Sequence, residues 1–132
     1  METYSRLLHE LYLCGARRFL LINVPPISRT PYFLALESWQ RERHEFAVDL
    51  FNVKLKSTSA DWLKDSDHSN VTLEMYDAWS FMTTILDQSE TYGFLNNECS
   101  GERCIWWDNY HPTTEFHHLL AADIQGSLKN HI

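Results

Sequence analysis

The sequence is poor in basic residues for its length. Lys and Arg together number 11, against 18 Asp and Glu in 132 residues, so the formal net charge at pH 7 is −7. Proteins that bind nucleic acids gather Lys and Arg into a basic stripe that displaces counterions. Here Arg41 and Arg43 flank Glu42 and are followed by Glu45, the pattern of a solvated helix surface. No nucleic-acid partner is expected.

Long apolar runs are missing as well. A membrane-spanning helix needs about 18 apolar residues, and no run here approaches that length; the run from Phe19 to Ile22, for example, is closed by Asn23 and Pro25. Charged residues interrupt the first apolar residues of the chain, which therefore lack the pattern of a secretory signal peptide. We expect neither a membrane span nor a signal peptide in this chain.

Cysteine is scarce, and the three that are present cannot all pair with one another. Cys14 lies far along the chain from Cys99 and Cys104, which share one loop-like segment with Gly101 between them. A local disulfide between Cys99 and Cys104 is one interpretation, and it would imply an oxidising compartment. Asn70 opens an N-glycosylation sequon, Asn-Val-Thr, which points to the same compartment.

The residues that are present give the composition of a globular protein, 44% hydrophobic and 14% aromatic. Apolar residues recur at helical or strand spacing in alternating segments. The expected elements are a helix over 2–14, a strand over Phe19–Val24, a long helix from Pro31 to about Lys56, a strand over Val71–Tyr76, a short helix over Trp79–Leu86 and a last helix from about Thr113 to Lys129. This order predicts an α/β protein of three layers with a parallel sheet.

Three of these segments allow more detailed predictions. The segment from Phe19 to Val24 shows no polar alternation, so we expect a strand covered on both faces. A polar loop is expected from Ser57 to Asp67, and the first helix is expected to have an aliphatic core face. The residues of the long helix expected to face the core are Leu36, Trp39, Phe46, Leu50 and Val53. Only two strands are found, and because a two-stranded sheet is marginal by itself, the chain is expected to be a piece of a larger domain.

The segment from Trp106 to Thr114 carries the most informative chemistry. It places Asp108 and His111 three residues apart, directly ahead of the last predicted helix. A serine hydrolase needs an imidazole whose one nitrogen takes the hydroxyl proton and whose other nitrogen is held by a carboxylate or carbonyl. Asp108 and His111 on one turn meet this demand, although such pairs also arise as capped helix ends.

Several further motifs resemble one family in their order along the chain. The segment Tyr12 to Pro26 is similar to a family block that reads L-Y-x-x-G-A-R, an apolar strand and N-x-P-P. Phe51-Asn52 with Leu55 resembles the family's F-N-x-x-L. The remaining matches, in order, are Asp77 before an apolar helix, Tyr92-Gly93-Phe94, Cys99, Cys104, the W-D-x-x-H-P-T block and His117 before Ala121. From about residue 7 to 128 the chain thus resembles the SGNH (GDSL) esterases and lipases, of the fungal secreted acylhydrolase or carbohydrate acetylesterase type.

The resemblance implies a fold, a reaction and a site. Residues 1–132 would form the C-terminal half of a flavodoxin-like SGNH domain, with the N-terminal strands missing. His111 would be the general base and Asp108 its orienting partner, acting without a cofactor on an acyl ester or an acetylated carbohydrate. Trp106 and Trp107 would be loop packing or a wall of the substrate pocket, and Asn23 would line the cleft or stabilise a turn. An extracellular location is expected for the intact protein.

The nucleophile of that family is not among these residues. The family places it in a G-D-S block, and none of Gly15, Gly93, Gly101 and Gly126 stands in such a block or in G-x-S-x-G. The missing N-terminal half is therefore expected to be required for activity, and the isolated chain is expected to have no meaningful esterase activity. The alternative is a truncated or non-catalytic binding piece.

Two metal sites compete with the serine-hydrolase interpretation. A zinc site could use Cys99 and Cys104 with His111 or His117. A metal-dependent hydrolase could use Asp108, His111, His117 and His118. Because adjacent residues of a helix point about 100° apart, His117 and His118 cannot both ligate easily, and no metal is expected.

Overall fold

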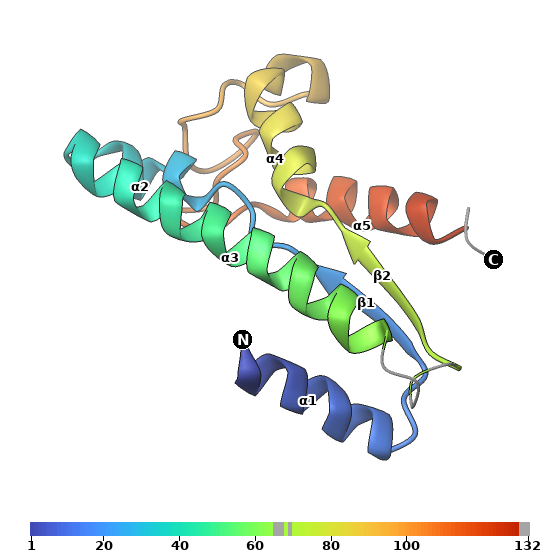
Figure 1. The fold of residues 1–132 in the computed structure, drawn as a ribbon. Helices are drawn as coiled ribbons and strands as arrows, with labels where there is room; N and C mark the ends of the chain where they lie inside the picture. The colour runs from blue at the N-terminus through green and yellow to red at the C-terminus, as the bar shows by residue number, and fades with distance from the viewer. Residues whose placement is uncertain (65–67, 69, 130–132) are drawn as a thin grey trace.

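The centre of the fold is a parallel pair of short strands. The computed structural model describes residues 1–64, 68 and 70–129. Strand β1 (Arg18–Ile22) pairs with β2 (Thr72–Tyr76) in a register that runs from Arg18 opposite Thr72 to Ile22 opposite Tyr76 (Figure 1). The predicted parallel pairing is confirmed, and the fold is mixed α/β.

Helices lie on both faces of this pair, as the three-layer prediction requires. Helices α1 (Glu2–Leu13) and α3 (Ser38–Lys64) cover one face, where Leu8 and Trp62 pack with Phe19 and Leu21 of β1 (Figure 1). Helix α5 (Thr114–Lys129) lies against the other face, where the Tyr76 hydroxyl donates to Asp123 at 2.8 Å. The core face of α1 is narrower and more aromatic than predicted, because Leu7 and Leu11 are exposed while Tyr4 and Tyr12 pack beside Leu8.

The prediction that the first strand is covered on both faces is wrong. Only the alternate residues Phe19 and Leu21 are buried, whereas Leu20 is half-buried and Ile22 is 49% exposed. The strand also ends two residues earlier than predicted. The side-chain amide of Asn52 binds both main-chain groups of Val24, accepting from its N–H and donating to its carbonyl at 2.9 Å each. Val24 therefore does not extend the hydrogen bonds of the strand pair.

The predicted helix from Pro31 to Lys56 is wrong at both ends. A short helix α2 (Pro31–Leu34), capped by the Thr30 hydroxyl, follows the turn η1 (Ile27–Arg29), and α3 begins only at Ser38. Helix α3 then continues through Ser57–Ser59, which were predicted as loop. The buried Ser59 hydroxyl is satisfied inside the helix, where it donates to the Leu55 carbonyl at 2.6 Å. Asp65, Ser66 and Asp67 of the predicted loop lie outside the described residues.

The predicted core face of the long helix is also wrong. Val48, Leu55 and Trp62 are the large apolar residues of α3 that are buried. Because they recur every seven residues, they lie on one side of the helix, which faces the sheet. Of the residues predicted to face the core, Leu36 is half-buried and precedes α3, whereas Trp39, Phe46, Leu50 and Val53 turn outward, with Phe46 69% exposed. Because α3 has two opposite apolar sides, its sequence alone does not determine which side packs against the sheet.

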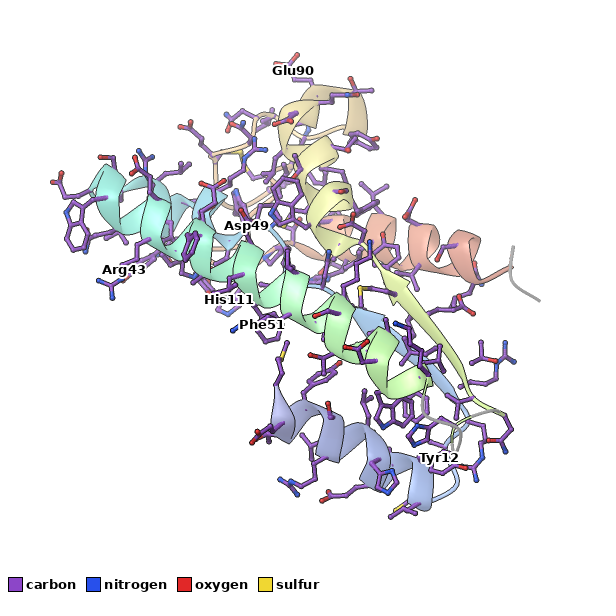
Figure 2. The ribbon with its side chains drawn as sticks, viewed as in Figure 1. Tyr12, Arg43, Asp49, Phe51, Glu90 and His111 are labelled. Carbon is purple, nitrogen blue, oxygen red and sulfur yellow. A yellow bond between two sulfur atoms is a disulfide. The ribbon has the colours of Figure 1, made fainter. Side chains whose placement is uncertain are left out.

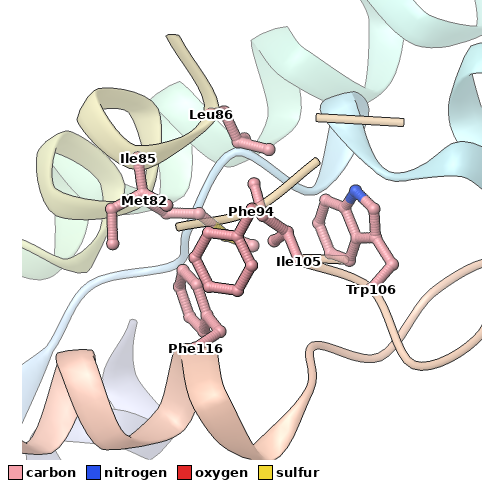
Figure 3. Close-up of a cluster of buried hydrophobic side chains, with 7 residues drawn as sticks. All are labelled: Met82, Ile85, Leu86, Phe94, Ile105, Trp106 and Phe116. Atoms are coloured by element: carbon pink, nitrogen blue, oxygen red, sulfur yellow. The ribbon is translucent and has the colours of Figure 1, made fainter. Parts of the chain in front are cut away.

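A second core joins the last third of the chain. Helix α4 (Ala78–Asp87) is capped by Asp77, whose carboxylate accepts from the Ser80 N–H. It leads through η3 (Ser89–Tyr92) into a long loop before α5. Figure 3 shows the side chains of this cluster from α4, the loop and α5, namely Met82, Ile85, Leu86, Phe94, Ile105, Trp106 and Phe116. The cluster fixes the start of α5, which is where the candidate site lies.

Candidate active site

The loop before α5 is held in shape by its own main chain and by one tryptophan. Trp106 is 1% exposed, forms isolated bridges with Ser100 and Pro112, and donates from its indole nitrogen to the Asn97 carbonyl at 2.9 Å. The buried Thr113 hydroxyl lies within hydrogen-bond distance of the carbonyls of Cys104 and Ile105, at 3.0 and 3.2 Å. These contacts give the loop a fixed path although it lacks regular secondary structure.

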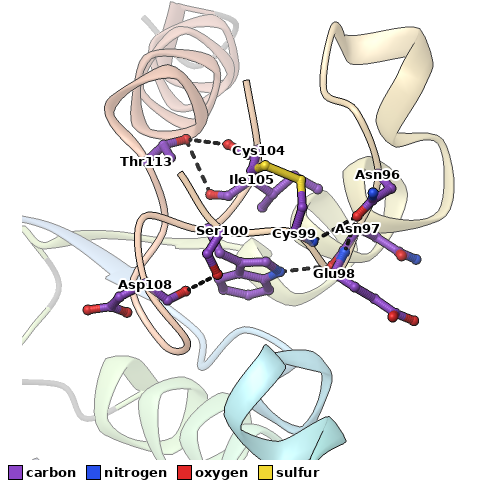
Figure 4. The surroundings of a disulfide bond; sticks show 10 residues. Asn96, Asn97, Glu98, Cys99, Ser100, Cys104, Ile105, Asp108 and Thr113 are labelled. Atoms are coloured by element: carbon purple, nitrogen blue, oxygen red, sulfur yellow. Dashed lines mark hydrogen bonds between the residues drawn. A yellow bond between two sulfur atoms is a disulfide. The ribbon is translucent and has the colours of Figure 1, made fainter. Parts of the chain in front are cut away.

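A disulfide closes one side of the same loop. Cys99 and Cys104 are bonded to each other, and between them the Ser100 hydroxyl donates to the main-chain carbonyl of Asp108 at 2.9 Å (Figure 4). Cys14 is exposed and free. The bonded sulfurs cannot act as thiolate ligands, so the zinc site built on Cys99 and Cys104 is not available in this structure.

Asp108 and His111 meet at the tip of this loop. Oδ2 of Asp108 lies 2.9 Å from Nδ1 of His111, while Oδ1 accepts the main-chain N–H groups of Tyr110 and His111 at 2.7 Å each. The loop also closes through the Trp107 N–H, which donates to the His111 carbonyl at 2.7 Å. The carboxylate therefore fixes both the turn and the orientation of the His111 ring. The second ring nitrogen, Nε2, takes no part in these contacts.

The hydrogen bonds to Asp108 favour its charged form. The main-chain N–H of His111, then its ring, then the main-chain N–H of Tyr110 lower the pKa of the Asp108 carboxyl to about 2. Asp108 is therefore ionised throughout the neutral pH range, the state in which a carboxylate can orient an imidazole and stabilise an imidazolium.

An apolar cavity of about 260 Å³ lies against His111. Its walls come from the segment after β1, from α4, from the loop and from α5, with Ile27, Met82, Trp106 and Phe116 as representative side chains. His111 has a side chain that is 71% exposed and is one of the few polar residues of this lining. An apolar hollow beside an exposed, carboxylate-held imidazole is the arrangement expected of a site that receives an uncharged organic group.

The other residues predicted for the site lie elsewhere or have structural contacts. Trp106 lines the cavity, whereas Trp107 is 70% exposed and does not. Asn23 lies at the end of β1, where its amide donates to Asp77 at 2.8 Å and its carbonyl oxygen accepts from the Trp79 N–H at 3.0 Å. Burial raises the pKa of Asp77, but hydrogen bonds from Ser80 and Asn23 outweigh it, so the pKa is lowered. Asn23 thus joins the ends of the two strands.

The residues of the proposed metal hydrolase do not converge. His117 lines the cavity beside His111, whereas His118 lines a separate hollow with Tyr92 and Glu102. Across residues 1–64, 68 and 70–129, no three His, Cys, Asp or Glu side chains are grouped so that they could hold a metal ion.

Two residues that support the site were not predicted as such. Ser100 holds the Asp108 carbonyl, and Asn52 holds Val24 just before the cavity wall begins at Pro25. Nothing in the spacing of Ser100 marks it. Asn52 stands in the F-N-x-x-L block, and a polar residue in that block next to the buried face of a helix is a signal for a contact of this kind.

Known proteins match nearly the whole chain. The family model for GDSL-like lipase/acylhydrolase matches residues 1–124. The chain belongs to this family. An acetylesterase of Thermothelomyces thermophilus is 34% identical over 133 residues and a GDSL esterase/lipase of Arabidopsis thaliana is 25% identical over 154, covering 98% and 96% of the chain. A thermolabile hemolysin of Vibrio parahaemolyticus is 24% identical over 153 residues, covering 96%.

The GDSL-like chain is much shorter than these relatives. It spans 43% of the length of the first two and 36% of the third. Its two-strand parallel sheet with helices on both faces agrees with part of a GDSL-type fold. Within the part of the chain that the structure describes, no helix is both long and apolar enough to cross a membrane.

Proposed function

We propose that this chain supplies the acid–base pair of a serine ester hydrolase. His111 acts as the general base and Asp108 as the residue that orients it. The observation that carries the proposal is the 2.9 Å contact between Oδ2 of Asp108 and Nδ1 of His111. With Nδ1 held, Nε2 is the nitrogen available to take a hydroxyl proton and later to give it to the leaving alcohol.

The serine in this mechanism comes from residues outside the chain. The sequence holds no G-D-S block, and the chain spans less than half of its esterase relatives. Residues 1–132 are then the C-terminal part of one SGNH domain, and the preceding part supplies the nucleophile and the oxyanion donors. The serine attacks the ester carbonyl, its proton passes to His111, and water hydrolyses the acyl-enzyme with the same base.

The substrate class follows from the cavity and from the relatives. An apolar hollow of about 260 Å³ beside His111 suits the acyl part of an ester, and one relative carries the name acetylesterase. We propose a carboxylic ester with a short acyl group, on a lipid-like alcohol or on a carbohydrate. The Cys99–Cys104 disulfide and the exposed Asn70 of the sequon support an extracellular location.

Hydrolysis of an aryl acetate tests the division of the site between two segments. We expect the purified 132-residue chain to show no turnover above buffer, because the nucleophile and the oxyanion donors are absent. Turnover that disappears in His111→Ala would show that a serine of this chain is the nucleophile. In that case the proposed role for a preceding segment is wrong.

A longer protein tests the roles of the pair themselves. If the reading frame upstream of Met1 encodes a G-D-S block, we expect His111→Ala and Asp108→Asn in that protein to lower kcat/KM by about 10³ to 10⁴. His118→Ala is the matched control, since His118 lies on α5 but lines a different hollow. Activity unchanged in both site variants would leave a non-catalytic binding piece as the better interpretation.

A further inference from the structure

The outward side of α3 carries an uncovered apolar stripe. Trp39, Phe46 and Val53 follow one another at seven-residue intervals and are 60%, 69% and 66% exposed, and Leu50, 43% exposed, lies between the last two. Because seven residues make nearly two helical turns, these four side chains, here called the outer stripe, lie along one face. This face is opposite the one that α3 buries against the sheet.

Charged residues border the outer stripe, and on each border the sign of the charge reverses along the helix. At 100° per residue, Glu42, Asp49 and Lys56 lie on one border of the outer stripe, seven residues apart. The charge on this border therefore changes from negative to positive along the helix. Arg43 lies on the other border and Asp61 follows it. Figure 2 shows Arg43 and Asp49 on opposite edges of α3. Asp61 contacts the exposed Lys64 at 3.4 Å, and an exposed ion pair of this kind contributes little.

We propose that the outer stripe pairs two copies of this chain, with their α3 helices antiparallel about a two-fold axis near Asp49. In that arrangement Glu42 of each copy faces Lys56 of the other. A two-fold contact buries the same patch on both copies, so Phe46 packs against the partner's Val53 and each apolar side chain is covered.

The charge of the helix favours a second copy over a lipid surface. Helices that lie in a membrane interface carry Lys and Arg on the face opposite their apolar side. The opposite face of α3 is instead buried against the sheet, and the charges bordering the outer stripe are of both signs. The whole chain carries a formal charge of −7, which opposes binding to an anionic bilayer.

The position of the axis gives a test of orientation. Asp49 meets its own copy near the axis, so that repulsion opposes pairing, and Asp49→Asn is expected to tighten it about threefold. Glu42→Lys is expected to weaken pairing about tenfold, because both symmetric pairs become repulsive. The double variant Glu42→Lys with Lys56→Glu is expected to restore it.

Sedimentation velocity and light scattering of the 132-residue chain between about 1 μM and 1 mM measure these effects. We expect a mass that rises from monomer to dimer with concentration, and no rise for Phe46→Glu. The control is Leu11→Glu on α1, where Leu11 is similarly exposed at 52%, and circular dichroism checks that each variant folds. Any of three results would overturn the proposal. The wild-type chain could stay monomeric over this range, or association could be abolished by Leu11→Glu but kept by Phe46→Glu. The third is binding of the monomer to neutral phospholipid vesicles through Phe46.

Discussion

Asp108 divides its two oxygens between the backbone and the imidazole. Oδ1 closes the turn through the N–H groups of Tyr110 and His111, and Oδ2 holds the His111 ring. The turn survives loss of the ring, since the main-chain donors do not depend on the side chain at position 111. We therefore expect substitution at His111 to remove one hydrogen bond to Asp108 and to leave the loop in place.

We expect the Asp108 carboxyl to titrate near pH 2 in carbon-detected NMR, and His111→Ala to raise this pKa while leaving it below the ordinary Asp value of about 3.9. Because the pKa is lower in the folded state, Asp108 stabilises the fold fully above about pH 4 and loses that contribution as the pH falls toward 2. Urea unfolding should show a smaller loss of stability over this interval in Asp108→Ala. An Asp108 pKa that does not move in His111→Ala would mean that the ring does not contact the carboxylate.

At the scale of elements, the sequence predicted which segments are helices and strands better than it predicted what they face. The strands, their parallel pairing and helices α4 and α5 follow from local patterns in residues 18–22, 72–87 and 114–129. The buried side of α3 did not, because Trp39, Phe46 and Val53 form as regular an apolar stripe as Val48, Leu55 and Trp62. The site geometry followed from spacing only where it is local, at Asp108 and His111. The wall of the cavity required segments distant in sequence.

Asn52 joins α3 to the end of β1 and gives an element-scale prediction. We expect Asn52→Ala to lower the free energy of unfolding by about 2 kcal/mol, since two part-buried main-chain bonds to Val24 are lost. Asn52→Asp is the matched variant, because a carboxylate still accepts from the Val24 N–H but cannot donate to its carbonyl. Denaturant unfolding of the three proteins measures both effects. Equal stability of Asn52→Ala and the wild type would show that water replaces the amide.

The whole molecule has two cores that differ in how completely they are enclosed. Around α4, the loop and α5, Ile85, Leu86, Ile105 and Trp106 are at most 1% exposed. Around the sheet, β1 pairs only with β2 among the described residues and leaves Ile22 half exposed. A two-stranded sheet is marginal without further strands, so the sheet is the part of this chain whose order depends most on additional contacts.

Amide hydrogen exchange should therefore be slower in the core around α4 and α5 than in the sheet. We expect protection in α4 and the first half of α5 to exceed that in β1, because local opening needs less free energy where fewer apolar contacts are broken. Mass spectrometry of peptides from residues 18–22 and 78–87 measures the difference directly. If exchange in β1 is as slow as in α4, the two strands are stable as a pair in the isolated chain. A neighbouring strand is then not needed to hold β1 in the position that places Pro25 and Ile27 in the cavity wall. If β1 exchanges faster and slows when a preceding segment is joined to the chain, the wall of the cavity and the nucleophile are completed by the same added strands.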